Sequence, residues 1–128
     1  MDDELYARGL ATRREVLGAD YVERALAGAD DFTRPLQEFV TRHAWGDIWN
    51  RPGLGRRERS LVNLALLTAL NRPHELSLHV RGALRNGVTV DEIREVLLHA
   101  AVYCGVPASM DAFRVARQAL DEAAAARD

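Results

Sequence analysis

Apolar side chains recur every three or four residues along most of the chain, a spacing that places them on one face of an α-helix. No run of alternating apolar and polar residues marks a β-strand. Glycines and prolines divide the pattern into segments, which lie at about 3–17, 20–27, 31–44, 56–71, 74–86, 89–104 and 108–125. The sequence therefore predicts an all-α protein, a single-domain helical bundle of about six helices.

Local signals refine the ends of these segments. The stretch Thr89-Val-Asp-Glu92 has the spacing of a capping box, and Gly87 before it is suited to a left-handed helix stop. The stretch WGDIWNRPGLG at residues 45–55 combines two tryptophans with glycines and a proline, so we expect a loop pinned by its aromatic side chains.

The expected apolar faces suggest how the helices pack. The segment 56–71 becomes apolar nearly all round, which is typical of a helix enclosed by other helices or by a partner subunit. Narrower apolar stripes are predicted elsewhere. They comprise Leu36, Phe39 and Val40, then Ile93, Val96, Leu97, Ala100, Ala101 and Cys104, and finally Met110, Phe113, Val115, Ala116 and Leu120.

Composition narrows the class of protein. The chain has 128 residues, of which 48% are hydrophobic, and 17 basic against 19 acidic residues leave a net charge of −2. These values fit one packed domain over 1–128. They argue against a disordered chain and against a protein that binds nucleic acid mainly through its phosphate backbone. Every basic residue is arginine, so a lysine Schiff base is excluded. The chain shows no secretory signal or long apolar run, and we expect a cytoplasmic protein without membrane contact.

Glu75 and His79 are the first candidates for chemistry. They are four residues apart and share a helix face, so the carboxylate could fix the imidazole tautomer and favour its protonated form. That arrangement supplies a proton donor near neutral pH, although a surface Glu-His pair without a function is the more frequent case. No C-x-x-C or Cys/His cluster occurs, and the spacing of Glu75 and His79 does not favour a metal site.

The remaining reactive side chains have simpler interpretations. Cys104 is expected to be a small buried hydrophobe, and His43 and His99 are expected to be structural. Trp45 and Trp49 fill the core or form one wall of a pocket for a flat ring. Four arginines at 51, 56, 57 and 59 face the positive end of a helix dipole, which suggests anion binding at that end.

Three motifs resemble the gamma-carboxymuconolactone decarboxylase family. They are W-G-x-I-W-x-R-P-G-L at 45–54, H-E-L-x-x-H at 74–79 followed by N-G-V-T, and Y-C-G-V-P at 103–107. The similarity runs from about Phe39 to Leu120, with the family core at 31–125 and two less distinctive N-terminal helices within 1–30. Peroxide-reducing relatives carry C-x-x-C-x-x-x-H, but Arg72 and Glu75 stand where those cysteines would be, so dithiol chemistry is excluded here.

The resemblance implies an alkylhydroperoxidase-like helical fold, a ring-shaped homohexamer or homotrimer, and a step in protocatechuate breakdown. It implies cofactor-independent decarboxylation of gamma-carboxymuconolactone to the enol-lactone of beta-ketoadipate, because the substrate contains its own electron sink. His79 is then the proton donor or oxyanion partner and Glu75 orients it. Arg51, and second Arg59, would bind a substrate carboxylate.

The same hypothesis gives Trp45, Trp49 and Tyr103 the walls around the substrate ring. No metal and no cofactor is expected, and the expected partners are the small dicarboxylate lactone and further copies of the chain. Two alternatives stay open. One is a non-catalytic helical oligomer or ligand-binding module, and the other is a decarboxylase or isomerase of a different unsaturated lactone acid.

Overall fold

A computed structural model describes residues 2–126, with side chains from residue 4 onward. Every element in that part of the chain is helical, so the all-α prediction is confirmed. The chain forms two compact units, Met1–Gly55 and Arg56–Asp128, with Arg51–Gly55 as the non-helical segment before the second unit. The expected single domain over 1–128 stays a prediction, and each unit is described by itself.

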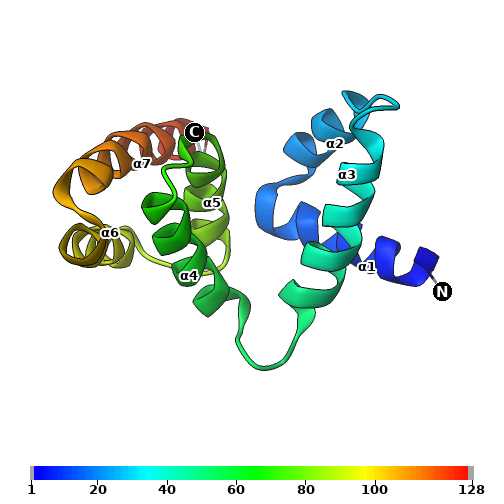
Figure 1. Ribbon diagram of the computed structural model, residues 1–128, viewed down its shortest axis with the longest axis horizontal. Coiled ribbons are helices and arrows are strands. Elements are labelled where there is room, and N and C mark those ends of the chain that lie inside the picture. Colours follow the sequence, from blue (N-terminus) through cyan, green and yellow to red (C-terminus); the bar gives the residue numbers. More distant parts are fainter. Residues whose placement is uncertain (1, 127–128) are drawn as a thin grey trace. The chain divides into compact units, whose positions relative to one another are not determined.

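The C-terminal unit consists of α4 (Arg56–Ala69), α5 (Pro73–Arg85), α6 (Val90–Cys104) and α7 (Val106–Ala126). Helices α4 and α7 each pack against both α5 and α6 (Figure 1). One cluster of buried apolar side chains holds the four helices together. It comprises Leu64, Leu76, Val80, Ala83, Val88, Ile93, Leu97, Ala112, Ala116 and Ala119.

Local sequence signals set the helix ends of this unit. Thr89 Oγ1 accepts a hydrogen bond from the Glu92 amide at 3.1 Å, and the Glu92 carboxylate accepts one from the Thr89 amide at 2.9 Å. The predicted capping box is therefore confirmed. Gly87 after α5 has φ +90°, a left-handed value that glycine adopts without strain, as expected for a helix stop.

The apolar stripes of this unit differ from the predicted ones. Cys104 was expected to be buried but is exposed, because it is the last residue of α6. On α7 the expected Met110 is also exposed. The side chains buried on α7 are small instead, at Ser109, Ala112, Ala116 and Ala119, which lets its neighbours approach closely.

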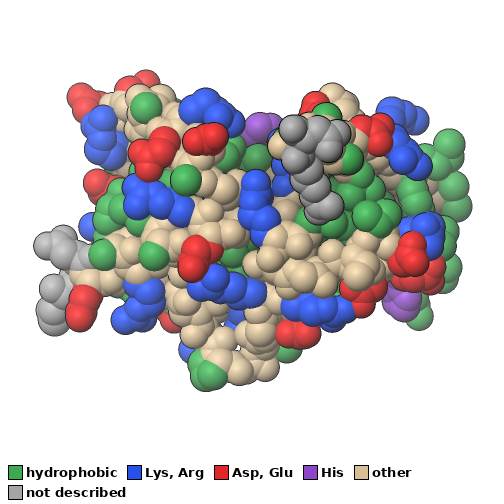
Figure 2. Space-filling view, turned by 180° about the vertical axis from the view of Figure 1, so that it is seen from behind, with side chains coloured by type: hydrophobic (Ala, Val, Ile, Leu, Met, Phe, Trp, Pro, Cys, Tyr) green, Lys and Arg blue, Asp and Glu red, His purple; other side chains and the backbone are tan. Residues whose placement is uncertain are grey.

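Helix α4 buries only part of its apolar surface. Leu64 is fully buried, whereas Val62 and Leu66 on the same helix, and Leu70 just after its end, are about half exposed or more. Further exposed apolar side chains belong to α6 and α7, and Figure 2 shows apolar side chains gathered at its right edge, over this unit. The C-terminal unit by itself thus leaves part of α4 uncovered, and the expected homo-oligomer stays a prediction.

The N-terminal unit consists of α1 (Asp2–Leu17), α2 (Ala19–Ala27), α3 (Arg34–Phe39), the π-helix η1 (Val40–Asp47) and the 3₁₀ turn η2 (Ile48–Asn50). The expected loop at 45–55 is wrong in its first half, because helical structure continues to Asn50. The expected stripe on α3 is wrong too, since Leu36 and Phe39 are each about 60% exposed.

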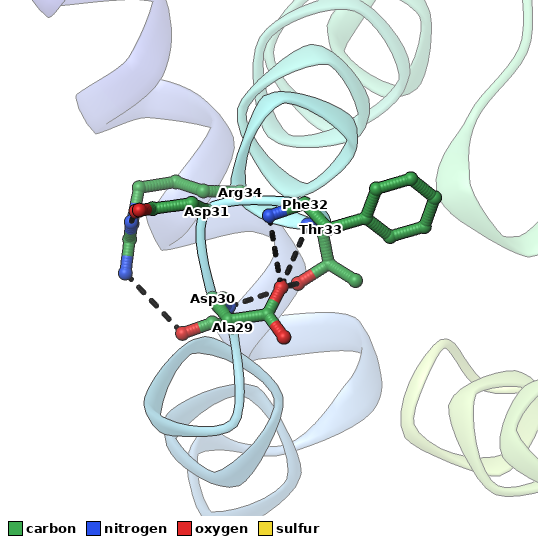
Figure 3. Close-up of polar contacts among 6 residues, drawn as sticks. All are labelled: Ala29, Asp30, Asp31, Phe32, Thr33 and Arg34. Atoms are coloured by element: carbon green, nitrogen blue, oxygen red, sulfur yellow. Dashed lines mark hydrogen bonds and ion pairs between the residues drawn. The ribbon is translucent and has the colours of Figure 1, made fainter.

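The turn between α2 and α3 is organised by Asp30 (Figure 3). Its carboxylate accepts hydrogen bonds from the backbone amides of Phe32 and Thr33, both at 3.0 Å, and from the Thr33 hydroxyl at 3.2 Å. These bonds, those from Thr33 first, lower the pKa of the Asp30 carboxyl. Arg34 closes the turn by donating to the Ala29 carbonyl at 3.2 Å. The ionised Asp30 carboxylate thus accepts from backbone amides that would otherwise need a backbone carbonyl as partner.

Two glycines allow α1 and η1 to cross with their backbones in contact. A Cβ at Gly9 would lie 1.9 Å from the Thr41 carbonyl oxygen, and one at Gly46 would lie 2.6 Å from the Leu5 carbonyl oxygen. No side chain fits at such distances, so the crossing requires glycine at both positions. The indole rings of Trp45 and Trp49 stack beside this crossing with centroids 4.9 Å apart.

We predict that Gly9→Ala lowers the free energy of unfolding by about 2 kcal/mol or more, because the new methyl group forces two backbones apart. Denaturant unfolding measures the change. Gly53→Ala is the matched control, since a Cβ there meets nothing within 4 Å and its φ is not left-handed. If Gly9→Ala unfolds like Gly53→Ala, the close crossing of α1 and η1 is wrong.

Candidate active site

His79 lies in the middle of α5, on the edge of the face that this helix buries. Pro73 in the first turn suits the start of α5, since proline lacks the amide hydrogen that would have no partner there. Leu76 and Val80 then enter the core with exposed fractions of 2% and 0%. His79 is adjacent to both in the helical register and is half-buried. Its imidazole is thus removed from most of the solvent.

Burial decides the charge of His79. It lowers the pKa of the imidazole from 6.5 to about 4, while the carboxylate of Glu75 acts in the opposite direction. Glu75 is exposed, so water screens its charge. The expectation of a protonated His79 near neutral pH is therefore wrong, although the sign of the Glu75 effect is as predicted. His79 is neutral at pH 7.

The contact that the sequence reasoning missed is Asn63 on α4. Its side-chain nitrogen Nδ2 lies 3.4 Å from Nδ1 of His79, and the pair is partly buried between α4 and α5. The signal was present in the sequence, because Asn63 is one of only two polar residues between Leu61 and Leu70. A polar side chain within such an apolar run favours a specific partner.

Arg59 lies one helical turn before Asn63 on the same face of α4 and is half-buried. Arg59 thus lies on the same face of α4 as Asn63, whose side-chain amide contacts His79. The neighbouring Arg57 pairs with Glu92 from the first turn of α6 and lies 3.7 Å from Glu58. The cluster of arginines at this helix start is therefore compensated in part by carboxylates of the chain itself.

Tyr103 lies on α6, with 79% of its side chain exposed, and its ring stacks on His99 at 5.1 Å between centroids. Both rings line a cavity of about 470 Å³ between α4 and α6. Leu61, Val62, Ala65, Val96, Ala100 and Cys104 complete its lining, and neither His79 nor Glu75 belongs to it. This cavity therefore does not bring Tyr103 together with His79.

A second cavity, of about 330 Å³, lies at the start of α5 between α4 and α7. Apolar side chains such as Leu67, Leu76 and Val115 line it together with polar ones, among them Arg72. Arg72 is the position where the peroxide-reducing relatives would carry a cysteine, and it is exposed here.

Trp45, Trp49 and Arg51 belong to the N-terminal unit. Both tryptophans are buried, with exposed fractions of 4% and 7%, whereas Arg51 is exposed at the end of η2. Asn50 fixes this segment, since its amide donates to the carbonyls of Trp45 and Gly46 at 2.9 and 3.1 Å. Their participation in a site with His79 stays a prediction.

The described part of the chain contains no group of three histidine, cysteine, aspartate or glutamate side chains placed to hold a metal ion. Within the same residues, no helix is long and apolar enough to span a membrane.

The chain matches a known protein family over a region that includes the helix carrying His79. The model of the carboxymuconolactone decarboxylase family matches residues 34–118, which is most of the chain. The chain belongs to this family. Its match includes α4, α5 and α6 and therefore Asn63, Glu75 and His79.

Individual relatives agree with the family. The chain is 50% identical over 125 residues to nitrosuccinic acid decarboxylase npaB of Metarhizium robertsii, covering 94% of this chain and 87% of the relative. It is 47% identical over 117 residues to 4-carboxymuconolactone decarboxylase of Acinetobacter baylyi, covering 91% of this chain and 87% of the relative. The prediction of a decarboxylase is confirmed, and the two names differ in substrate.

Proposed function

We propose that the chain removes carbon dioxide from a small dicarboxylate that delocalises the resulting electron pair by itself, with gamma-carboxymuconolactone as the first candidate. The observation that carries the proposal is a half-buried, neutral His79 in a chain that is 47% identical to a 4-carboxymuconolactone decarboxylase. A neutral imidazole suits a reaction in which negative charge develops on an oxygen, because it donates a hydrogen bond without carrying charge.

The chemistry of this lactone needs little from the protein. The carboxylate on the ring carbon gamma to the carbonyl leaves as carbon dioxide, and its bonding pair spreads through the ring double bond onto the carbonyl oxygen. The dienolate then takes a proton from water at the carbon next to the carbonyl, which gives the enol-lactone of beta-ketoadipate. A dissociable cofactor is not needed as an electron sink. The protein binds the dianion and stabilises the developing oxyanion.

His79 is the oxyanion partner in this proposal. With a pKa of about 4, little of the His79 side chain is imidazolium at neutral pH, so it is a poor acid for protonating the substrate carbon. The N–H of the neutral ring remains a hydrogen-bond donor. Glu75, one helical turn earlier, orients the imidazole ring. Arg59, on the α4 face that contacts His79, is the better supported carboxylate ligand, with Arg51 as the second. Trp45, Trp49 and Tyr103 remain proposed walls for the substrate ring.

Nitrosuccinate is the second candidate substrate, favoured by the 50% identity to a nitrosuccinic acid decarboxylase. It is also a small dicarboxylate. The carboxylate bonded to the nitro-bearing carbon leaves as carbon dioxide, and its bonding pair moves onto the nitro oxygens. The nitro-bearing carbon then takes a proton from water. The same oxyanion partner serves both reactions. A role in protocatechuate catabolism belongs to the first candidate alone, whereas a cytoplasmic homohexamer or homotrimer is proposed with either substrate.

We predict that the purified protein accelerates carbon dioxide release from gamma-carboxymuconolactone or from nitrosuccinate, measured against the uncatalysed loss of each compound. His79→Ala is expected to lower kcat by about 10²-fold to 10³-fold, the usual cost of losing one oxyanion donor. His74→Ala, an exposed histidine on the same helix, is the control and should keep kcat within a few fold.

Inactivity toward both compounds would favour the non-catalytic helical module of the same fold. Turnover of a different unsaturated lactone acid by the same His79 would instead correct the substrate. If folded His79→Ala turns over as fast as His74→Ala, the role of His79 is wrong.

We also predict that Arg59→Ala raises KM for the dicarboxylate by about tenfold or more with a smaller change in kcat, because it removes a charged hydrogen-bond donor to a carboxylate. Arg94→Ala on α6 is the control, since Arg94 is exposed and pairs with Asp91 at 2.9 Å. Steady-state kinetics of both variants decide the point. Equal KM values in the two variants would remove Arg59 from the site.

A further inference from the structure

We propose that Asn63 is the positioning residue that fixes the tautomer of His79, so that the neutral ring carries its one proton on Nε2. This inference rests on the proposed function for its catalytic meaning, but its structural content is independent of any substrate. It starts from the 3.4 Å approach of Asn63 Nδ2 to His79 Nδ1 across the α4–α5 packing.

The donor and acceptor inventory of the two side chains leads to one tautomer. The amide nitrogen of asparagine carries two hydrogens and no acceptor lone pair, so it only donates. Nδ1 of His79 must then be the acceptor, and an accepting ring nitrogen is unprotonated. Because the neutral ring holds a single proton, that proton lies on Nε2. Asn63 thus selects which edge of the imidazole donates.

The location of the pair makes the selection effective. Both side chains are partly buried, and α4 and α5 share the core around Leu64, Leu76 and Val80, so neither helix is free to turn away. In water the two neutral tautomers differ little in energy, whereas one retained hydrogen bond in a partly buried site favours one of them clearly. Glu75 alone, exposed on the surface, does not impose this constraint.

The functional consequence concerns the oxyanion. If His79 donates a hydrogen bond to the developing negative oxygen, the donating nitrogen must be Nε2, because Asn63 contacts Nδ1. A protein with the other tautomer would present a lone pair to that oxygen and repel it. Asn63 would therefore act through His79 and without contacting the substrate itself.

The first test is the ring ¹⁵N spectrum of the wild-type protein near pH 8, without substrate. Protonated and unprotonated imidazole nitrogens have clearly different chemical shifts, and the His79 signals are assigned by their loss in His79→Gln. We expect His79 Nε2 to be protonated and Nδ1 to be unprotonated. A proton on Nδ1, or rapid averaging between both nitrogens, would overturn the proposal even if every Asn63 variant failed to fold.

The second test is Asn63→Asp, which places an acceptor opposite Nδ1 and should move a proton onto that nitrogen. We expect kcat to fall by about tenfold or more with a smaller change in KM, as for a misplaced hydrogen-bond donor. Asn86→Asp is the matched control, because Asn86 also joins the two helices, donating to Ser60 Oγ at 2.9 Å. It should leave the His79 spectrum and kcat close to wild type.

The outcomes separate this proposal from the proposed function. An unchanged His79 spectrum in folded Asn63→Asp contradicts the tautomer assignment, and a changed spectrum with unchanged kcat contradicts the positioning role. If the spectra behave as expected but wild type decarboxylates neither compound, the substrate proposal fails while the tautomer assignment stands.

Discussion

The removal of one imidazole from water is the constraint on which the proposed chemistry of this protein depends. His79 lies between a core-facing leucine and valine on α5, and its burial lowers its pKa further than the charge of Glu75 raises it. The two effects compete in the same helical turn, and the exposure of Glu75 decides between them. The result is a neutral imidazole at physiological pH, in a chain whose relatives include two named decarboxylases.

The helix ends and the core packing of the C-terminal unit hold this arrangement in place. The capping box of α6 and the left-handed Gly87 after α5 fix where these helices start and stop. Small buried residues on α7 allow close packing against α5, so the register of His79 relative to α4 is set by the core. Asn63 then meets His79 because the two helices cannot shift independently.

The sequence predicts the features that depend on neighbours along the chain, and it fails where exposure decides. The helical class, the capping box and the turn at Gly87 are local, and all were predicted correctly. Cys104 and Phe39 lie on periodic apolar stripes yet are exposed, because periodicity does not show where a helix ends or what covers it. The charge of His79 was predicted wrongly for the same reason, since spacing shows Glu75 but not burial.

Some residues of the candidate site could be found from the sequence, and others only from the packing of the helices. The resemblance pointed to His79 and to two arginines, Arg51 first and Arg59 second. The family match covers residues 34–118 and so includes all three. Asn63 escaped notice because its partner is 16 residues away on another helix, a relationship that only packing reveals. Trp45, Trp49 and Arg51 lie in a unit of their own, so their part in the site depends on experiment.

The pH dependence of kcat/KM tests the central claim most directly, because it reports the ionisation of the free protein. If neutral His79 is the active form, the rate is level across neutral pH and falls only on the acid side, toward the pKa of about 4. The acid limb should be absent from the residual activity of His79→Ala. A rate that instead falls as the pH rises through about 6 to 7 would show that the imidazolium is required, and would contradict the account.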